Sequence, residues 1–159
     1  MIAVVGHRDL SAHTLELVET ELRARLARLT GGAPACVRAG AGLPLASARA
    51  AREAGRALTV LLPAQGAVPA VLPEPDRRAT GEMLVLAACV RLLAFDPQNR
   101  DACVGADETL VGGSRSVLAV WDGSPSDGSD ATAHLVAFAR TRGIPVEVVW
   151  PDGAARGSA

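Results

Sequence analysis

Residues 117–134 constrain the fold more than any other stretch of this 159-residue chain. They begin with five consecutive apolar residues, 117–121, which predicts a short strand buried on both faces. Residues 122–130 are rich in Gly, Ser, Asp and Pro, a composition typical of turns, and Ser129 or Asp130 is suited to cap a following helix. The apolar stripe predicted for this helix consists of Ala131, Leu135, Phe138 and Ala139. Because the first N–H groups of a helix have no internal partner, this pattern predicts either an anion site or a plain strand-to-helix connection.

The composition predicts one folded domain over residues 1–151 and a flexible tail over 152–159. Apolar residues make up 49% of the chain, which is too high for a disordered body. The 16 basic residues, all of them arginine, are balanced by 17 acidic ones, so we do not expect nucleic acid or a membrane as a partner. Lysine and tyrosine are absent, which excludes mechanisms that depend on either side chain.

The cysteines predict a reducing compartment. Cys36, Cys89 and Cys103 lie far apart in apolar surroundings, without a spacing suited to zinc. An odd count with no visible leader sequence predicts buried thiols in a cytoplasmic protein. No apolar run approaches the roughly 18 residues of a membrane helix. We therefore expect a cytoplasmic protein with neither a metal nor a cofactor.

Segments typical of strands and of helices alternate along the chain. Apolar segments of strand length lie at 2–5, 35–38, 58–62, 91–95, 117–121 and 146–150. Segments with helical spacing or capping signals lie at 11–30, 43–55, 81–88, 97–111 (with Asp96 as its cap) and from 131 onward. This alternation predicts a Rossmann-like, doubly wound α/β fold with a mostly parallel sheet. Residues 63–80 are predicted to be a long loop, and 83–95 also fits a single buried helix.

Three loops compete for the ligand crevice of such a fold, which lies at the carboxyl ends of the strands where the strand order reverses. They are residues 6–9, 39–44 and 122–130. His7 and Arg8 offer an imidazole and a fork-shaped phosphate donor. The glycines of the second loop either let the backbone approach a phosphate or make a tight turn, and Asp122 either holds ribose hydroxyls or fixes its own loop. The candidate ligand-binding residues are Gly6, His7, Arg8, Gly40, Ala41, Gly42, Asp122, Gly123, Ser129, Asp130, Ala131 and Thr132.

Three segments also resemble a known family. Residues 4–8 look like a first strand and turn, residues 39–63 like a glycine-rich segment and a strand ending in proline, and residues 119–146 like a second glycine motif and last strand. In these features the chain resembles the SLOG superfamily, which includes the DNA-processing protein A fold and the LONELY GUY and "lysine decarboxylase-like" phosphoribohydrolases. The resemblance implies a Rossmann-like nucleotide-binding domain that forms a homodimer. Residues 83–95 would supply the dimer surface, unless they are buried within the monomer.

The chain departs from the hydrolase branch of that family at the catalytic motif. The branch has a proline-glycine-glycine loop, a glycine-threonine pair and a glutamate three residues past the threonine, and the glutamate position falls on Leu135. The basic pair of the preceding helix would fall within 105–109, which contains no basic residue. Asp130 either substitutes for the missing carboxylate or caps the helix.

Three functions follow from these observations. The first is a non-catalytic binder or sensor of a nucleotide or another phosphoribosyl molecule. The second is a nucleoside 5′-monophosphate phosphoribohydrolase-like N-glycosidase that uses a rearranged carboxylate such as Asp122 or Asp130. The third is an interaction protein whose crevice is vestigial.

Overall fold

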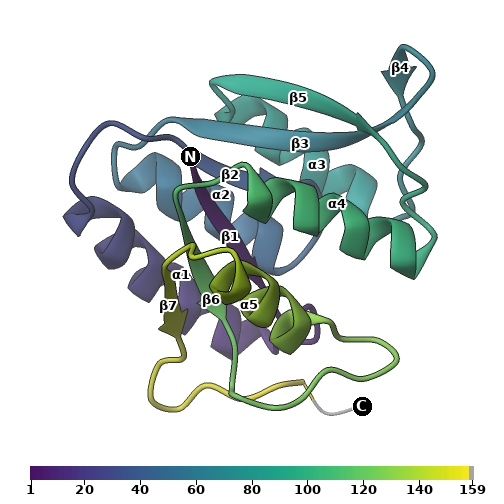
Figure 1. Ribbon diagram of the computed structural model, residues 1–159. Coiled ribbons are helices and arrows are strands. Elements are labelled where there is room, and N and C mark those ends of the chain that lie inside the picture. The colour runs from purple at the N-terminus through teal and green to yellow at the C-terminus, as the bar shows by residue number, and fades with distance from the viewer. Residues whose placement is uncertain (158–159) are drawn as a thin grey trace.

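A mostly parallel sheet runs through the protein (Figure 1), and the computed structural model describes residues 1–157 of it. The central strand β1 pairs in parallel with β2 on one side and with β6 on the other. β3 follows β2 and pairs in parallel with β5, and β7 follows β6. The strands are β1 (Ile2–Gly6), β2 (Ala35–Arg38), β3 (Leu58–Gln65), β4 (Val68–Pro69), β5 (Cys89–Ala94), β6 (Ser116–Val120) and β7 (Val146–Val149). The strand order therefore reverses between β1 and β6, as the predicted Rossmann-like fold requires.

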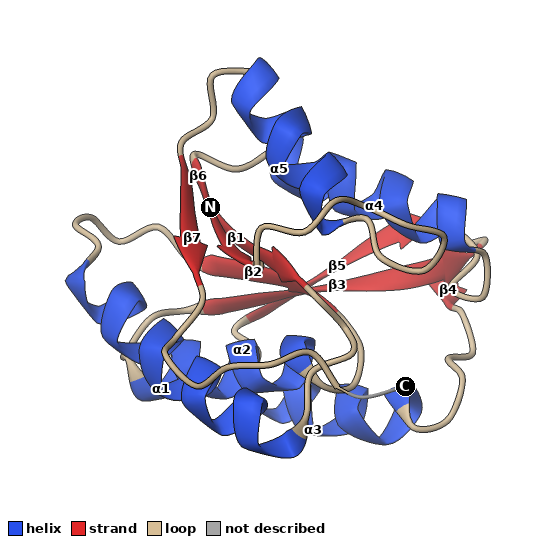
Figure 2. Ribbon diagram, turned by 90° about the horizontal axis from the view of Figure 1, so that it is seen from below, coloured by secondary structure: helices blue, strands red, loops and turns tan. Residues whose placement is uncertain are grey.

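Five helices cover the two faces of the sheet. Figure 2 shows α1, α2 and α3 on one face and α4 and α5 on the other. The helices are α1 (Ala12–Arg28), α2 (Leu43–Glu53), α3 (Asp76–Leu86), α4 (Arg100–Gly112) and α5 (Thr132–Thr141). Alternate residues of β1 serve the two layers: Ile2 and Val4 pack toward α1 and α2, whereas Ala3 and Val5 pack toward α4 and α5. Within residues 1–157, every helix is too short or too polar to cross a membrane.

Two helix starts differ from the predicted ones. α4 begins at Arg100, and its N-cap is Asn99, whose side chain accepts a hydrogen bond from Ala102 N–H. Asp96 instead accepts from Gln98 N–H in a turn before the helix. The N-cap of α5 is Ala131, rather than Ser129 or Asp130, and it makes no side-chain capping bond.

The expected long loop at residues 63–80 is shorter than predicted. β3 continues to Gln65, β4 follows as an antiparallel strand on its end, and α3 begins at Asp76. Residues 83–95 form the end of α3 and then β5, which excludes the single buried helix. Burial within the monomer accounts for Met83, which is fully buried, but not for Leu84, Val85, Val90 and Leu92, which are exposed. The homodimer that the family resemblance implies stays a prediction.

The three thiols are free but differ in exposure. Cys36 is buried as expected, Cys103 is half-buried and Cys89 is exposed because it lies on the edge strand β5. The cytoplasmic location that was inferred from them stays a prediction.

Residues 152–157 contact the domain, in contrast to the flexible tail expected for 152–159; the last two residues lie outside the described part. Thr14 Oγ1 donates to Ala155 O at 2.9 Å, and Arg156 Nε lies 3.0 Å from both carboxylate oxygens of Asp9. These bonds fasten the C-terminal segment beside the loop that follows β1.

Candidate functional site

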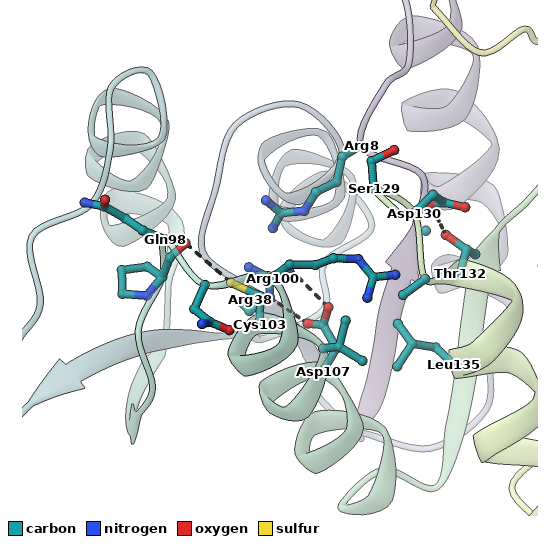
Figure 3. Close-up of a pocket in the computed structure, with 15 residues that line it drawn as sticks. Arg8, Arg38, Gln98, Arg100, Cys103, Asp107, Ser129, Asp130, Thr132 and Leu135 are labelled. Atoms are coloured by element: carbon teal, nitrogen blue, oxygen red, sulfur yellow. Dashed lines mark hydrogen bonds and ion pairs between the residues drawn. The ribbon is translucent and has the colours of Figure 1, made fainter. Parts of the chain in front are cut away.

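A crevice of about 250 Å³ opens at the carboxyl ends of β1 and β2, between α4 and the loop before α5. This is the edge at which the strand order reverses, and therefore the place where doubly wound folds bind ligands. Figure 3 shows the lining side chains around this space. They come from four segments: residues 6–8 at the end of β1, Arg38 at the end of β2, residues 97–107 in α4 and the turn before it, and residues 129–135.

Three arginines line the crevice. Arg38 ends β2 and forms a two-pronged ion pair with Asp107, with Nε–Oδ1 at 2.6 Å and Nη2–Oδ2 at 3.1 Å. Arg100 donates through Nη2 to Asp127 O at 2.8 Å, and so joins the start of α4 to the loop before α5. The Arg8 guanidinium has no hydrogen-bonding or ion-pair partner among residues 1–157. Burial and the nearby charge of Arg38 lower the pKa of Arg8, but arginine keeps its charge at any physiological pH.

The N-terminus of α5 faces the same crevice. Ser126 Oγ accepts from His134 N–H at 3.0 Å, but Ala131 at the N-cap position supplies no side-chain acceptor for the earlier N–H groups. Ala131 and Thr132 line the cavity. Uncapped N–H groups and the positive end of the helix dipole together favour an anion.

A buried charge cluster lies directly beneath this helix start. His7 is fully buried, with Nδ1 3.1 Å from Asp130 Oδ1 and Nε2 3.0 Å from Asp122 Oδ1. Thr132 Oγ1 donates to the same Asp130 oxygen at 2.8 Å, and Trp150 packs edge-on against the imidazole. Burial lowers the pKa of His7, but the hydrogen bonds to Asp130 and Asp122 and the charge of Asp130 outweigh it, so the pKa is raised.

The pKa values of the two carboxyl groups in this cluster are lowered, whereas that of His7 is raised. Burial raises the pKa of Asp122, but hydrogen bonds from Ser124 and His7 outweigh it and lower the pKa to about 2. Burial likewise opposes ionisation of Asp130, and hydrogen bonds from His7 and Thr132 again lower its pKa. These shifts favour the charged form of His7 between two carboxylates. His7 Nε2 also lies 3.1 Å from the backbone N–H of Asp122, a hydrogen bond that this nitrogen accepts only in the neutral imidazole.

These shifts predict how stability depends on pH. Above the ordinary histidine pKa of 6.5, the folded protein binds more protons than the unfolded chain, so the free energy of unfolding falls as pH rises through the raised pKa of His7. Below the ordinary aspartate pKa of 3.8, it falls again toward the lowered pKa of Asp122, about 2. We expect maximum stability between pH 3.8 and 6.5, measured as the urea midpoint across pH. A His7→Asn variant should lose the decline above pH 6.5, and an equal decline in that variant would contradict the assignment.

The crevice brings together half of the residues that the sequence singled out. The candidates that line it are Gly6, Arg8, Ser129, Asp130, Ala131 and Thr132. His7 does not line the crevice. It is buried beneath it, where both ring nitrogens contact carboxylates, those of Asp130 and Asp122. Asp122 and Gly123 follow β6 outside the lining, and Asp122 holds its own turn by accepting from Ser124 N–H at 2.9 Å.

The second glycine loop also lies outside the lining. Residues 40–42 lead into α2 on the opposite face of the sheet, and Ala41 N–H donates to Asp76 Oδ1 at 2.8 Å. A Cβ on Gly40 would lie 3.5 Å from Arg8 Nη2, so this loop packs behind the arginine.

Sequence reasoning missed several lining residues, including Arg38, Arg100 and Asp107. Arg38 carried a usable signal, because a charged residue at the end of a buried strand points to the ligand edge. The other two lie on α4, and nothing in the sequence shows which face of that helix turns toward β2. No group of three or more His, Cys, Asp or Glu within residues 1–157 is placed to hold a metal ion.

Comparisons with known proteins identify relatives by fold. No protein-family model matches the sequence, and no curated protein matches it. The structure is similar to that of the Moco carrier protein from Chlamydomonas reinhardtii, with a TM-score of 0.58 and 17% identity over 95% of this chain and 76% of that one. It is also similar to DNA processing protein A from Helicobacter pylori, with a TM-score of 0.63 and 14% identity over 98% of this chain and 68% of that one.

The second of these proteins corrects one expectation. DNA processing protein A binds single-stranded DNA, which conflicts with the expectation that nucleic acid is not a partner. The expectation rested on an overall charge near zero, and overall charge does not report how arginines are grouped on the surface.

Proposed function

Because this chain has a SLOG-type fold, we propose that its crevice binds a phosphate-bearing small molecule of the nucleotide class. The observation that carries this proposal is the unpartnered Arg8 guanidinium, which lines the same cavity as the uncapped start of α5. Both groups favour an anion, and a phosphate accepts hydrogen bonds from a guanidinium fork and from helix N–H groups together. Arg100 also lines the crevice and adds a second cation, whose only carboxylate partner in the described structure is the exposed Asp101, at 3.4 Å and outside the lining.

The proposed role is binding or sensing rather than cleavage. The carboxylates that line the crevice are Asp107 and Asp130. Asp107 is held by Arg38, and Asp130 has one oxygen bound by His7 and Thr132 and the other buried. Leu135, which the family resemblance places at the glutamate of the hydrolases, lines the wall. A phosphoribohydrolase reaction needs a carboxylate that can exchange a proton with the substrate, and neither aspartate is free to do so.

Binding of mononucleotides tests this proposal. We expect Arg8→Gln to weaken binding of AMP or GMP roughly ten- to a hundred-fold, because one or two charge-assisted hydrogen bonds are lost. Isothermal titration calorimetry measures this change. Arg28→Gln is the matched control, because it removes the same charge from the exposed end of α1 and should leave the affinity unchanged.

Three further results of the binding experiments would favour other functions or another phosphate site. Free base released from the nucleotide by the wild-type protein would favour the N-glycosidase. An oligonucleotide that binds where AMP, GMP, CMP and UMP do not would identify single-stranded nucleic acid as the ligand. Equal affinities of the Arg8→Gln and wild-type proteins would place the phosphate elsewhere.

A further inference from the structure

A second cavity of about 480 Å³ opens beside the crevice. We call it the side chamber. Its walls include Gln65, Val71, Phe95, Asp96, Pro97 and Gln98. Pro97 and Gln98 also line the crevice, so the two cavities lie on either side of the turn that precedes α4. The crevice, at about 250 Å³, is smaller than the roughly 300–1,000 Å³ of ordinary small-molecule sites, whereas the side chamber, at about 480 Å³, lies within that range.

The two cavities differ in charge. Three arginines line the crevice, but no basic side chain lines the side chamber. Its one ionisable group is Asp96, whose Oδ1 accepts from Gln98 N–H at 2.9 Å. A carboxylate disfavours a second phosphate, so the chamber suits a neutral group or one that carries an amine.

The walls of the side chamber suit a flat ring. Phe95 is half-buried and presents an aromatic side chain to it, and Val71 is 72% exposed although it is apolar. A ring placed between them would cover apolar surface that residues 1–157 leave in water. The side-chain amides of Gln65 and Gln98 offer donors and acceptors to the edge of such a ring.

We propose that the side chamber binds the heteroaromatic ring of a ligand whose phosphate lies in the arginine crevice. The inference rests on the proposed function and names the ligand class more narrowly: a mononucleotide-like molecule with its base against Phe95. This second part of the site contains none of the ligand-binding residues predicted from the sequence and none of the three crevice arginines. It depends on the hairpin of β3 and β4 approaching the turn that precedes α4.

The test compares AMP and GMP with ribose 5-phosphate, which carries the phosphate but no ring. Loss of base–aromatic stacking in Phe95→Ala should weaken nucleotide binding about ten-fold and leave ribose 5-phosphate binding unchanged. Because Phe95 is partly buried, Val71→Glu provides an exposed second variant, which should weaken binding of the nucleotides through steric and charge conflict. Val68→Glu is its control on the same hairpin, since Val68 is exposed but does not line the chamber.

The outcomes separate this inference from the proposed function. If the wild-type protein binds ribose 5-phosphate as tightly as AMP and GMP, or if the Phe95→Ala and Val71→Glu variants keep wild-type affinity for the nucleotides, the side chamber does not hold the ring, although the arginine crevice still holds the phosphate. If neither the nucleotides nor ribose 5-phosphate binds at millimolar concentration, both proposals fail.

Discussion

Replacement of His7 by leucine is expected to lower the free energy of unfolding by about 3–5 kcal/mol, the usual effect of removing one partner from a buried ion pair. His7 is fully buried, and its two ring nitrogens lie 3.1 Å from Asp130 Oδ1 and 3.0 Å from Asp122 Oδ1. Without the imidazole, Asp130 remains buried with only the Thr132 hydroxyl bound to its Oδ1, while its Oδ2 already has no partner in the described structure. A carboxylate in that position must either stay charged without compensation or take up a proton.

Urea unfolding at pH 6 measures this effect. The control is His134→Leu, which removes an exposed histidine paired with Glu108 at 3.3 Å and should change stability by less than about 0.5 kcal/mol. Adding Asp130→Asn to His7→Leu removes the uncompensated charge and should restore part of the loss. A cost below about 1 kcal/mol for His7→Leu would show that the cluster does not stabilise the fold.

Replacement of Gly6 by alanine is expected to destabilise the protein by about 3 kcal/mol, at the upper end of ordinary overpacking. Gly6 is the last residue of β1 and pairs with Val120 of β6. An added Cβ would collide with the Val120 carbonyl oxygen and would lie 2.8 Å from Leu43 Cδ2. The carbonyl belongs to the backbone of the neighbouring strand, so the sheet itself must shift, and with it the edge that carries Arg8.

Thermal or urea unfolding of Gly6→Ala should show this loss. Gly105→Ala is the matched control with the opposite expected sign. Gly105 lies inside α4 with nothing within 4 Å of an added Cβ, so alanine should stabilise the helix by roughly 0.5–1 kcal/mol. If both variants were equally stable, the close approach of β1 and β6 at Gly6 would not be the limiting contact.

Local patterns in the sequence were enough to predict the fold class and most of the parallel strands, but not the short antiparallel strand β4. The apolar runs at 2–5, 35–38 and 58–62 are all strands, and the segment at 117–121 becomes β6 with a shift of one residue. These runs are short and continuous, which fits parallel strands buried on both faces. The Rossmann-like, doubly wound sheet predicted from their alternation with helices is confirmed.

The site was less predictable because its decisive contacts join distant residues. His7 is separated from Asp122 and Asp130 by more than a hundred residues, and the pattern around it reads as an exposed polar turn. Asp130 looks like a helix cap in sequence, but its Oδ1 is bound to His7, and the N-cap position of α5 falls on Ala131, which has no side-chain acceptor. The contact between His7 and Asp130 therefore explains both why the predicted cap is wrong and why the first N–H groups of α5 face the crevice without a side-chain acceptor from the N-cap residue.

The side chain of Arg38 illustrates a second limit. Its place at the end of a strand is visible in the sequence, but whether its charge is free depends on Asp107, which α4 brings to it from the next layer. Ion pairs between distant elements, such as Arg38 with Asp107, determine which crevice arginine keeps an unpaired guanidinium that can bind a ligand.

The central position of β1 bears on the order in which this protein can assemble. Its two edges are completed by strands from opposite ends of the chain, since Ile2 pairs with Ala35 and also with Ser116. During synthesis, β2 and β3 emerge early, whereas the edge meant for β6 waits for most of the polypeptide. Long-range pairing of this kind raises the contact order and slows folding. Until β6 arrives, the nascent protein exposes an open, apolar strand edge, the feature that chaperones protect and that aggregation exploits.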